Sequence, residues 1–376
     1  MTERKPFSLE KKHITVCIVS PFPPPFGGMA VQAEKLASHL ECEGFPVIRV
    51  RTNTEFPKSF GFVSKIPGLR TVFNFVLFLK NLHKGILQSD IVYFFTAFYN
   101  FFFWVTYPAI ILIKLCRKKL ILSARGGAAG EFFRQYRWIL KPVIHKADVV
   151  TTPSGFLAET FWQAFGIKAR IVPTIADLHQ FVFRERECFQ PLLLSTRSFE
   201  KIYDVECIIR AFRIVSEQYP QARLGIAGEG SLRKELEKFV SDLKLNESVV
   251  FYGSVTHQKM QHLYQEYDIL VNASRVDNLP GTILEAYACG LPVVSTNAGG
   301  ILHIITDEKT GLLVTVGDYK SLAEKVIRIV ENPQLGKRLA QTGAEYCKIY
   351  SWDYVKKIIL PLLHSVSAKA QEGKSC

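Results

Sequence analysis

The sequence predicts an α/β protein with two doubly wound domains, each built around a parallel β-sheet. Three observations support this prediction. The chain has 376 residues, short apolar runs alternate with amphipathic segments, and this alternation starts again after residues 184–191. A chain of this length exceeds one typical hydrophobic core, so two domains are the default expectation. Strands that alternate with helices indicate βαβ units and therefore parallel pairing.

In the first half, the first strand is expected at residues 13–20, followed by a proline-rich loop. Residues 29–43 carry apolar positions at helical spacing, and Gly44 is placed to end that helix. Further segments that combine a strand with the loop after it are predicted at 45–53, 90–96, 119–127, 147–155 and 169–174.

The second half starts after a predicted linker at residues 184–191, and a helix is expected at 205–220. Strands with their following loops are predicted at 191–198, 222–230, 248–255, 267–274, 291–300 and 310–318. The predicted domains are therefore 1–187 and 188–350, followed by a helix at 351–376. In doubly wound sheets the loops after the strands hold the ligand, and two such domains predict a pocket in a central cleft between them.

The composition is that of a globular protein, with 48% hydrophobic and 22% charged residues. None of the eight cysteines forms a CxxC pair, so we expect reduced thiols in a cytoplasmic protein. The nine histidines show no HExxH spacing, so no metal site is expected. The first apolar run is short and stops at prolines, which indicates a buried strand rather than a signal peptide.

The net charge of +13 is concentrated in the first half of the chain. Residues 1–190 contain 25 Lys and Arg against 13 Asp and Glu, whereas residues 191–376 contain 22 against 21. Such an excess is either a solvated basic surface or a contact for an anionic partner, such as a membrane face or a lipid phosphate. No nucleic-acid readout motif accompanies it, so a nucleic-acid partner is not expected.

Residues 91–113 carry no charged side chain. Their length would allow a membrane-spanning helix, but Asn100 and Pro108 interrupt the segment and another strand follows it. Two other readings stay open. In the first, the aromatic residues, followed by basic ones at 114–119, form a face that dips into a bilayer. In the second, the same residues form a wholly buried helix.

Four motifs lie at ends of predicted strands. Gly27 and Gly28 precede a helix start, where backbone amides can meet an anion. Arg197, with Lys201 nearby, follows a strand and suits a diphosphate. Gly228, Glu229 and Gly230 form a glycine-rich loop, and Ser231 is placed to cap the next helix.

The fourth motif is an acid pair, Asp277 and Glu285, on either side of a turn and a helix start. One interpretation is local: Thr282-x-x-Glu285 fits a capping box, and Asp277 fits a turn. The other is that the two carboxylates bind one ligand from two sides. The local sequence leaves both readings open.

Together, these motifs resemble the GT-B retaining glycosyltransferases of family 4, the glycosyl transferases group 1 type. That pattern joins a GG loop, an Arg/Lys pair, a strand ending in GxG, and an acid-x7-acid motif followed by ACGxPVV. Here these are Gly27-Gly28, Arg197 with Lys201, Gly228-Glu229-Gly230, and Asp277 with Glu285 before ACGLPVV. The resemblance covers most of the chain and is strongest over 191–350.

The resemblance implies a metal-independent hexosyltransferase that uses a nucleotide-diphosphate sugar and needs no cofactor. By match, Glu285 would bind the ribose hydroxyls and Asp277 those of the donor sugar. Arg197 and Lys201 would neutralise the departing diphosphate. Further donor contacts would come from Gly27, Gly28, Gly228, Glu229, Gly230, Asn278, Leu279, Pro280, Gly281 and Thr282. The first domain would bind a glycan or lipid-linked acceptor, and the final helix would pack back on that domain.

Four departures from the family pattern stand out. Asp277 takes the place of the usual Glu, and Lys201 is one residue closer to Arg197 than usual. Arg125 lies where many relatives have a histidine near the donor sugar. The usual GGxPE sequence is replaced at residues 299–303. We therefore expect a cytoplasmic enzyme of polysaccharide or glycolipid biosynthesis, either free or peripheral on the inner face of the membrane. The alternatives are a degenerate glycan-binding GT-B module and a GT-B epimerase or phosphorylase.

Overall fold

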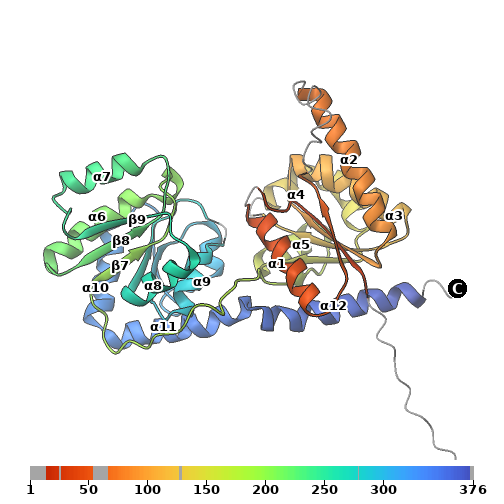
Figure 1. Cartoon of the computed structure of the whole chain (residues 1–376). Coiled ribbons are helices and arrows are strands. Elements are labelled where there is room, and N and C mark those ends of the chain that lie inside the picture. Colours follow the sequence, from red (N-terminus) through yellow and green to blue (C-terminus); the bar gives the residue numbers. More distant parts are fainter. Residues whose placement is uncertain (1–13, 25–26, 54–66, 127–128, 278, 373–376) are drawn as a thin grey trace, which may run out of the picture. The chain divides into compact units, whose positions relative to one another are not determined.

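The structure is a computed structural model, and it describes residues 14–24, 27–53, 67–126, 129–277 and 279–372. The chain divides into two compact units, one formed by Met1–Ile175 with Val355–Cys376 and the other by Ala176–Tyr354. Figure 1 shows a β-sheet with helices on both faces in each unit. The predicted fold class, two domains with parallel sheets, is confirmed.

The first sheet has six strands in the order β2-β1-β3-β4-β5-β6, and they pair in parallel. Val16 of the first strand lies opposite Val47 on one side and Ile91 on the other. The strands are β1 (Val16–Ser20), β2 (Val47–Arg51), β3 (Ile91–Thr96), β4 (Lys119–Ala124), β5 (Val149–Thr152) and β6 (Arg170–Ile171).

The helices of this unit include one π-helical segment, η3. They are α1 (Gly28–Cys42), α2 (Pro67–Leu87), η3 (Phe102–Thr106), α3 (Tyr107–Leu115), α4 (Ala129–Ile144) and α5 (Gly155–Phe165). The long helix α12 (Trp352–Glu372) belongs to this unit from Val355 onward. Its Lys356 pairs with Glu43, which follows α1.

The second sheet has the order β12-β11-β10-β7-β8-β9, again with parallel pairing. Its strands are β7 (Leu192–Ser195), β8 (Arg223–Ala227), β9 (Val249–Gly253), β10 (Ile269–Asn272), β11 (Val293–Thr296) and β12 (Leu312–Val314). The strand order reverses between β7 and β10, where Leu193 lies opposite Ile269. Ligands of doubly wound sheets bind outside the carboxyl ends of the strands at this point.

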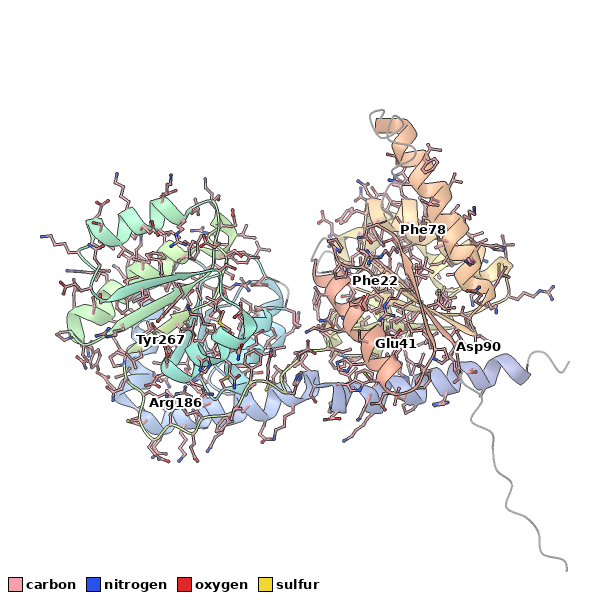
Figure 2. All side chains as sticks on the ribbon, viewed as in Figure 1. Phe22, Glu41, Phe78, Asp90, Arg186 and Tyr267 are labelled. Atoms are coloured by element: carbon pink, nitrogen blue, oxygen red, sulfur yellow. The ribbon has the colours of Figure 1, made fainter. Side chains whose placement is uncertain are left out.

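The helices of the second unit cover both faces of its sheet. They are η4 (Lys201–Tyr203), α6 (Val205–Gln218), α7 (Arg233–Asp242), α8 (His257–Glu266), α9 (Gly281–Ala288), η5 (Gly299–His303), α10 (Tyr319–Glu331), α11 (Pro333–Cys347) and η6 (Lys348–Tyr350). Neighbouring residues of one strand point to opposite faces. Leu193 and Ile269 therefore join one core cluster, and Leu194 and Leu270 join another. Figure 2 shows side chains filling both interiors, with Phe78 in the first unit and Tyr267 in the second.

The uncharged stretch at 91–113 forms β3, η3 and most of α3, and its helical part is only partly buried. Among the described helices, none is long and apolar enough to cross a membrane. Phe98 and Phe102 are buried and contact the ring of Phe132 on α4. Of the aromatic side chains in the stretch, Trp104 is the most exposed, at 70%.

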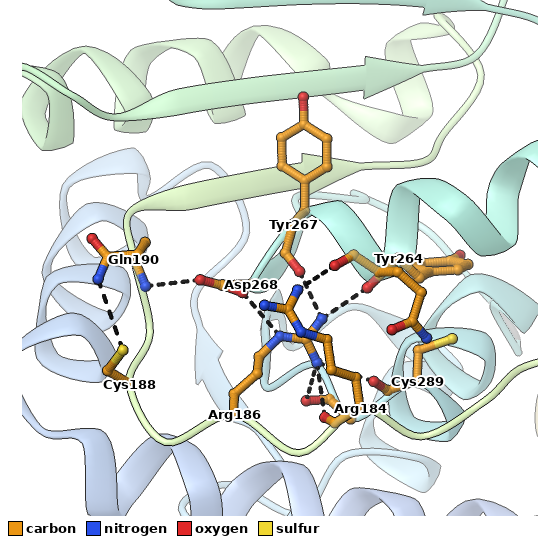
Figure 3. A network of polar contacts seen from close by, with 10 residues as sticks. Arg184, Arg186, Cys188, Gln190, Tyr264, Tyr267, Asp268 and Cys289 are labelled. Atoms are coloured by element: carbon orange, nitrogen blue, oxygen red, sulfur yellow. Dashed lines mark hydrogen bonds and ion pairs between the residues drawn. The ribbon is translucent and has the colours of Figure 1, made fainter.

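The segment predicted as a linker, 184–191, lies within the second unit, which begins at Ala176. Arg186 is only 5% exposed. Its Nε donates to Asp268 Oδ1 at 2.9 Å, and its Nη atoms donate to main-chain carbonyls. Those carbonyls belong to Arg184, Tyr264, Tyr267, Cys289 and Gly290, at 2.8–3.1 Å (Figure 3).

Arg186 therefore joins the ends of two helices. Tyr264 and Tyr267 are at the end of α8 and just beyond it, and Cys289 and Gly290 directly follow α9. The last carbonyls of a helix lack partners within it, and a guanidinium supplies donors to them. Asp268 balances the buried positive charge and also accepts from the backbone of Gln190 at 2.9 Å.

Candidate active site

Two loops of the second unit meet at the reversal of its strand order. One follows β7 and carries Arg197, and the other follows β10 and carries Asp277. Because β7 and β10 are parallel neighbours, their carboxyl ends lie at the same edge of the sheet. The sequence-predicted cation and first acid are thereby brought together.

Arg197 and Asp277 form an ion pair between Nη2 and Oδ2, and their side chains are 12% and 11% exposed. The guanidinium also lies over the ring of Tyr203, 4.3 Å from its centroid. Burial lowers the pKa of Arg197, yet arginine stays protonated because its ordinary pKa is far above neutrality. Its Nε is buried and has no hydrogen-bond partner among the described residues.

A chain of hydroxyl and amide groups fixes the Asp277 loop. Ser274 Oγ lies 3.2 Å from Asp277 Oδ2 and 2.9 Å from Asn272 Oδ1. The Asp277 carbonyl accepts from the backbone of Gly300 at 2.8 Å. Gly299 has φ 50°, and a Cβ there would lie 2.5 Å from that same carbonyl oxygen. Only glycine therefore allows this approach.

Glu285 is held from another helix. Tyr264 of α8 donates its hydroxyl to Glu285 Oε2 at 3.0 Å, and the same hydroxyl lies 3.3 Å from the Thr282 carbonyl oxygen. Burial, and secondly the charge of Glu285, raises the pKa of Tyr264 well above its usual value. The phenol therefore stays neutral and remains a donor.

The capping interpretation of this acid is wrong. Helix α9 begins at Gly281 with Pro280 as its N-cap, so Thr282 lies inside the helix and is not its cap. The Glu285 carboxylate reaches Tyr264 instead. Gly281, Thr282 and the flanking Leu279 and Pro280 supply the first turn and its approach, where backbone amides lack partners within the helix. Asn278, also predicted as a donor contact, lies outside the described residues.

The GEG loop packs directly on the loop after β7. A Cβ at Gly228 would lie 2.2 Å from the Arg197 carbonyl oxygen, and one at Gly230 would lie 2.6 Å from that of Phe199. Backbone contact therefore explains both glycines. The carboxylate of Glu229 pairs with Arg233, four residues further on.

Ser231 does not cap α7 as predicted. Its hydroxyl donates to Glu200 Oε2 at 2.9 Å, and its backbone N–H donates to Oε1 of the same side chain at 3.0 Å. Leu232 is the N-cap of that helix. The serine thus ties the GEG loop to the loop that carries Arg197.

No contact among the described residues places Lys201 near the acid pair. It lies exposed on the short helix η4 and has no ion pair or hydrogen bond there with the described residues. Tyr203, at the end of the same turn, meets Arg197 instead. The sequence reading missed Tyr203 and Tyr264, because neither belongs to a motif and both act through contacts between separate elements.

The first unit holds the remaining predicted residues. Gly27 is the N-cap of α1 and Gly28 its first residue, and a Cβ at either would meet no atom within 4 Å. Local packing therefore does not require these glycines. Arg125 follows β4, donates to Thr174 Oγ1 at 3.2 Å and lies 5.2 Å from the centroid of the Phe95 ring.

Arg125 shares one property with Arg197: its Nε is buried and has no hydrogen-bond partner within the described residues. A small cavity beside it is lined by apolar side chains and by Gln32 and Tyr93. Burial lowers the pKa of Arg125.

Two Rossmann-like domains, each built on a parallel sheet, form the GT-B fold. Residues 184–346, within the second domain, match the family described as glycosyl transferases group 1.

Named glycosyltransferases are similar to this chain in sequence, and solved structures share its fold. The chain is 24% identical over 269 residues to a sulfoquinovosyl transferase of Arabidopsis thaliana, covering 66% of this chain and about half, 52%, of the relative. It is 25% identical over 271 residues to a GDP-mannose-dependent phosphatidylinositol monomannoside mannosyltransferase of Mycolicibacterium smegmatis, covering 66% and 71%. The fold matches an Anabaena protein solved with UDP and glucose, with TM-score 0.66, 17% identity, and coverage of 94% of this chain and 100% of that chain.

Proposed function

We propose that this protein is a retaining glycosyltransferase of family 4 that moves a sugar from a nucleotide-diphosphate donor to a glycan or lipid-linked acceptor. The observation that carries the proposal is the acid pair at the switch point of the second sheet. Asp277 is held beside the buried cation of Arg197, and Glu285 is oriented by Tyr264 at the start of α9. Relatives named as mannosyl and sulfoquinovosyl transferases support it.

Each group has a role that its chemistry suits. Glu285 accepts hydrogen bonds from the ribose, and Asp277 accepts them from the donor sugar. Arg197 neutralises the charge that grows on the departing diphosphate, with the first amides of α9 beside it. Fixed cations and amides aimed at developing charge lower a barrier most. The anomeric carbon passes through an oxocarbenium-like state as the diphosphate leaves.

We propose that the anomeric configuration is retained because the acceptor hydroxyl attacks the donor sugar on the same face from which the diphosphate leaves. Asp277 is a poor nucleophile because Arg197 holds its carboxylate. The leaving phosphate then takes the proton of the acceptor hydroxyl. Since Arg197 supplies the cation, we expect transfer to continue when EDTA removes divalent metals.

A panel of UDP-, GDP- and ADP-sugars tests the donor proposal. At least one should raise the midpoint of thermal unfolding of the wild-type protein. Proton NMR of the product then shows whether the anomeric configuration of the donor is kept. Nucleotide binding without transfer to any glycan or lipid acceptor would favour the degenerate binding module. Inversion of configuration would contradict the retaining mechanism.

We further propose that α4 rests on an anionic membrane surface that presents the acceptor. This helix exposes Trp138 at 89% and Ile139 at 51%, with Arg134, Arg137 and Lys141 exposed around them. Apolar and basic groups on one helix are typical of interfacial binding. Figure 1 shows α4 in the basic first unit.

Co-flotation with vesicles tests this contact. The wild-type protein should float with vesicles rich in phosphatidylglycerol and should lose binding as salt rises, because salt screens the basic residues. Trp138→Ala should float less. Equal flotation with neutral phosphatidylcholine vesicles would contradict the electrostatic part of the proposal.

A further inference from the structure

We propose that the Asp277 carboxylate and the donor diphosphate compete for the Arg197 guanidinium, so that Asp277 limits how tightly the site holds a nucleoside diphosphate. This inference rests on the proposed function. It adds a second role for Asp277, as a competing anion that weakens the retention of the nucleotide product.

The guanidinium is fixed where an anion would meet it. Tyr203 stacks on its face at 4.3 Å, which leaves the edge of the planar group for anions. One Nη is engaged by Asp277, and Nε is buried without a partner among the described residues. A guanidinium has five N–H donors in a fixed fork that suits two phosphate oxygens. The donors that match a phosphate are therefore partly taken by a carboxylate of the same protein.

The competing carboxylate is itself well anchored. Ser274 Oγ lies 3.2 Å from Asp277 Oδ2, and Gly300 fixes the Asp277 carbonyl through a 2.8 Å hydrogen bond. Ser274 in turn meets Asn272, which donates to Ser295 Oγ at 2.9 Å on the neighbouring strand. Asp277 thus cannot swing away without breaking contacts. It stays near Arg197 and repels an incoming phosphate.

The sign of the effect follows from the charges. A diphosphate that binds Arg197 must share or displace the carboxylate, and two anions at one cation repel each other. Removing the charge of residue 277 should therefore strengthen binding of a nucleoside diphosphate. The same change weakens the proposed grip on the donor sugar, so it should slow transfer. Tighter nucleotide binding with slower transfer is not expected for a residue that only binds sugar.

Isothermal titration calorimetry with UDP, GDP and ADP tests the inference. For the nucleotide that the wild type binds, Asp277→Asn should lower Kd about tenfold, in the range measured for close charge pairs. Ser274→Ala is the matched control, because it removes a contact of Asp277 but no charge. It should change Kd much less. Thermal unfolding of each variant shows that the domain is folded.

The double variant Arg197→Met with Asp277→Asn makes the test specific. Replacing both partners leaves no unpaired charge in the site. In the Arg197→Met background, Asp277→Asn should no longer tighten binding. If it still does, the effect comes from general charge removal and the inference is wrong. It is equally wrong if Asp277→Asn alone binds the nucleotide no more tightly. A wild type that binds none of the three nucleotides would instead overturn the proposed function.

Discussion

Arg186, which is buried, and Arg197, which is largely buried, both pair with an aspartate in the second domain, yet their surroundings differ. Arg186 donates to Asp268 and to five main-chain carbonyls. Arg197 has a single ion pair, one aromatic ring and an unpartnered Nε among the described residues. A buried donor without a partner costs free energy unless something else binds it. The comparison separates an arginine that completes the fold from one that can accept a ligand.

The largest expected effect is on stability, where replacing Arg186 should cost more unfolding free energy than replacing Arg197. Arg186→Met should lower the free energy of unfolding of the second domain by about 3–5 kcal/mol, because it leaves Asp268 buried without its cation. Arg197→Met removes fewer contacts and should cost clearly less. Urea unfolding followed by circular dichroism measures both, with the second domain's transition resolved from the first. Equal losses would show that the two arginines are alike.

The next effect concerns catalysis. Glu285→Ala should reduce transfer at least about a hundredfold, since an interaction of about 3 kcal/mol at the reacting complex corresponds to that factor. Glu308→Ala is the matched control, because Glu308 is paired with Lys325 and Arg328 away from the acid pair. Steady-state rates with a saturating acceptor decide the question. A near-wild-type transfer rate for the Glu285 variant would contradict the role proposed for Glu285.

The smallest expected effect concerns the hydroxyl of Tyr264, a neutral hydrogen-bond donor to Glu285. Tyr264→Phe deletes one hydrogen bond to Glu285 and should weaken donor binding by about 0.5–1.5 kcal/mol, roughly two- to twelvefold. Tyr267→Phe is the control, because Tyr267 Oη lies 3.0 Å from Tyr252 Oη and not at an acid. Donor affinity should fall only in the first variant. Equal losses in both would mean that Tyr264 acts on packing alone.

Much of the fold was predictable, because strand–helix alternation reports parallel sheets directly. The placement of Arg197 and Asp277 was predictable for the same reason, since both follow strands whose carboxyl ends adjoin. Partners from other elements were not. Tyr264 meets Glu285 across 21 residues, and local sequence carries no trace of that contact. The capping box at Thr282 failed because α9 begins at Gly281 with Pro280 as its N-cap, which places Thr282 inside the helix.

The burial of Arg186 was not predictable for a related reason. The sequence around Arg186 indicates only a linker, and burial of an arginine is rare unless it is paired. Here Asp268, 82 residues away, supplies that pair. Basic character in the first domain likewise gave only a general expectation of an anionic partner. The exposure of Trp138 could not be predicted, because it depends on which face of α4 packs against the domain.

The docking of Arg186 also determines where the second domain can be separated from the rest of the protein. A fragment that starts at residue 188 lacks the side chain that ties together the ends of α8 and α9. One that starts at Ala176 keeps it. Limited proteolysis of the intact protein should therefore spare the peptide bonds around Arg186, even though their sequence is rich in the basic residues that trypsin cleaves.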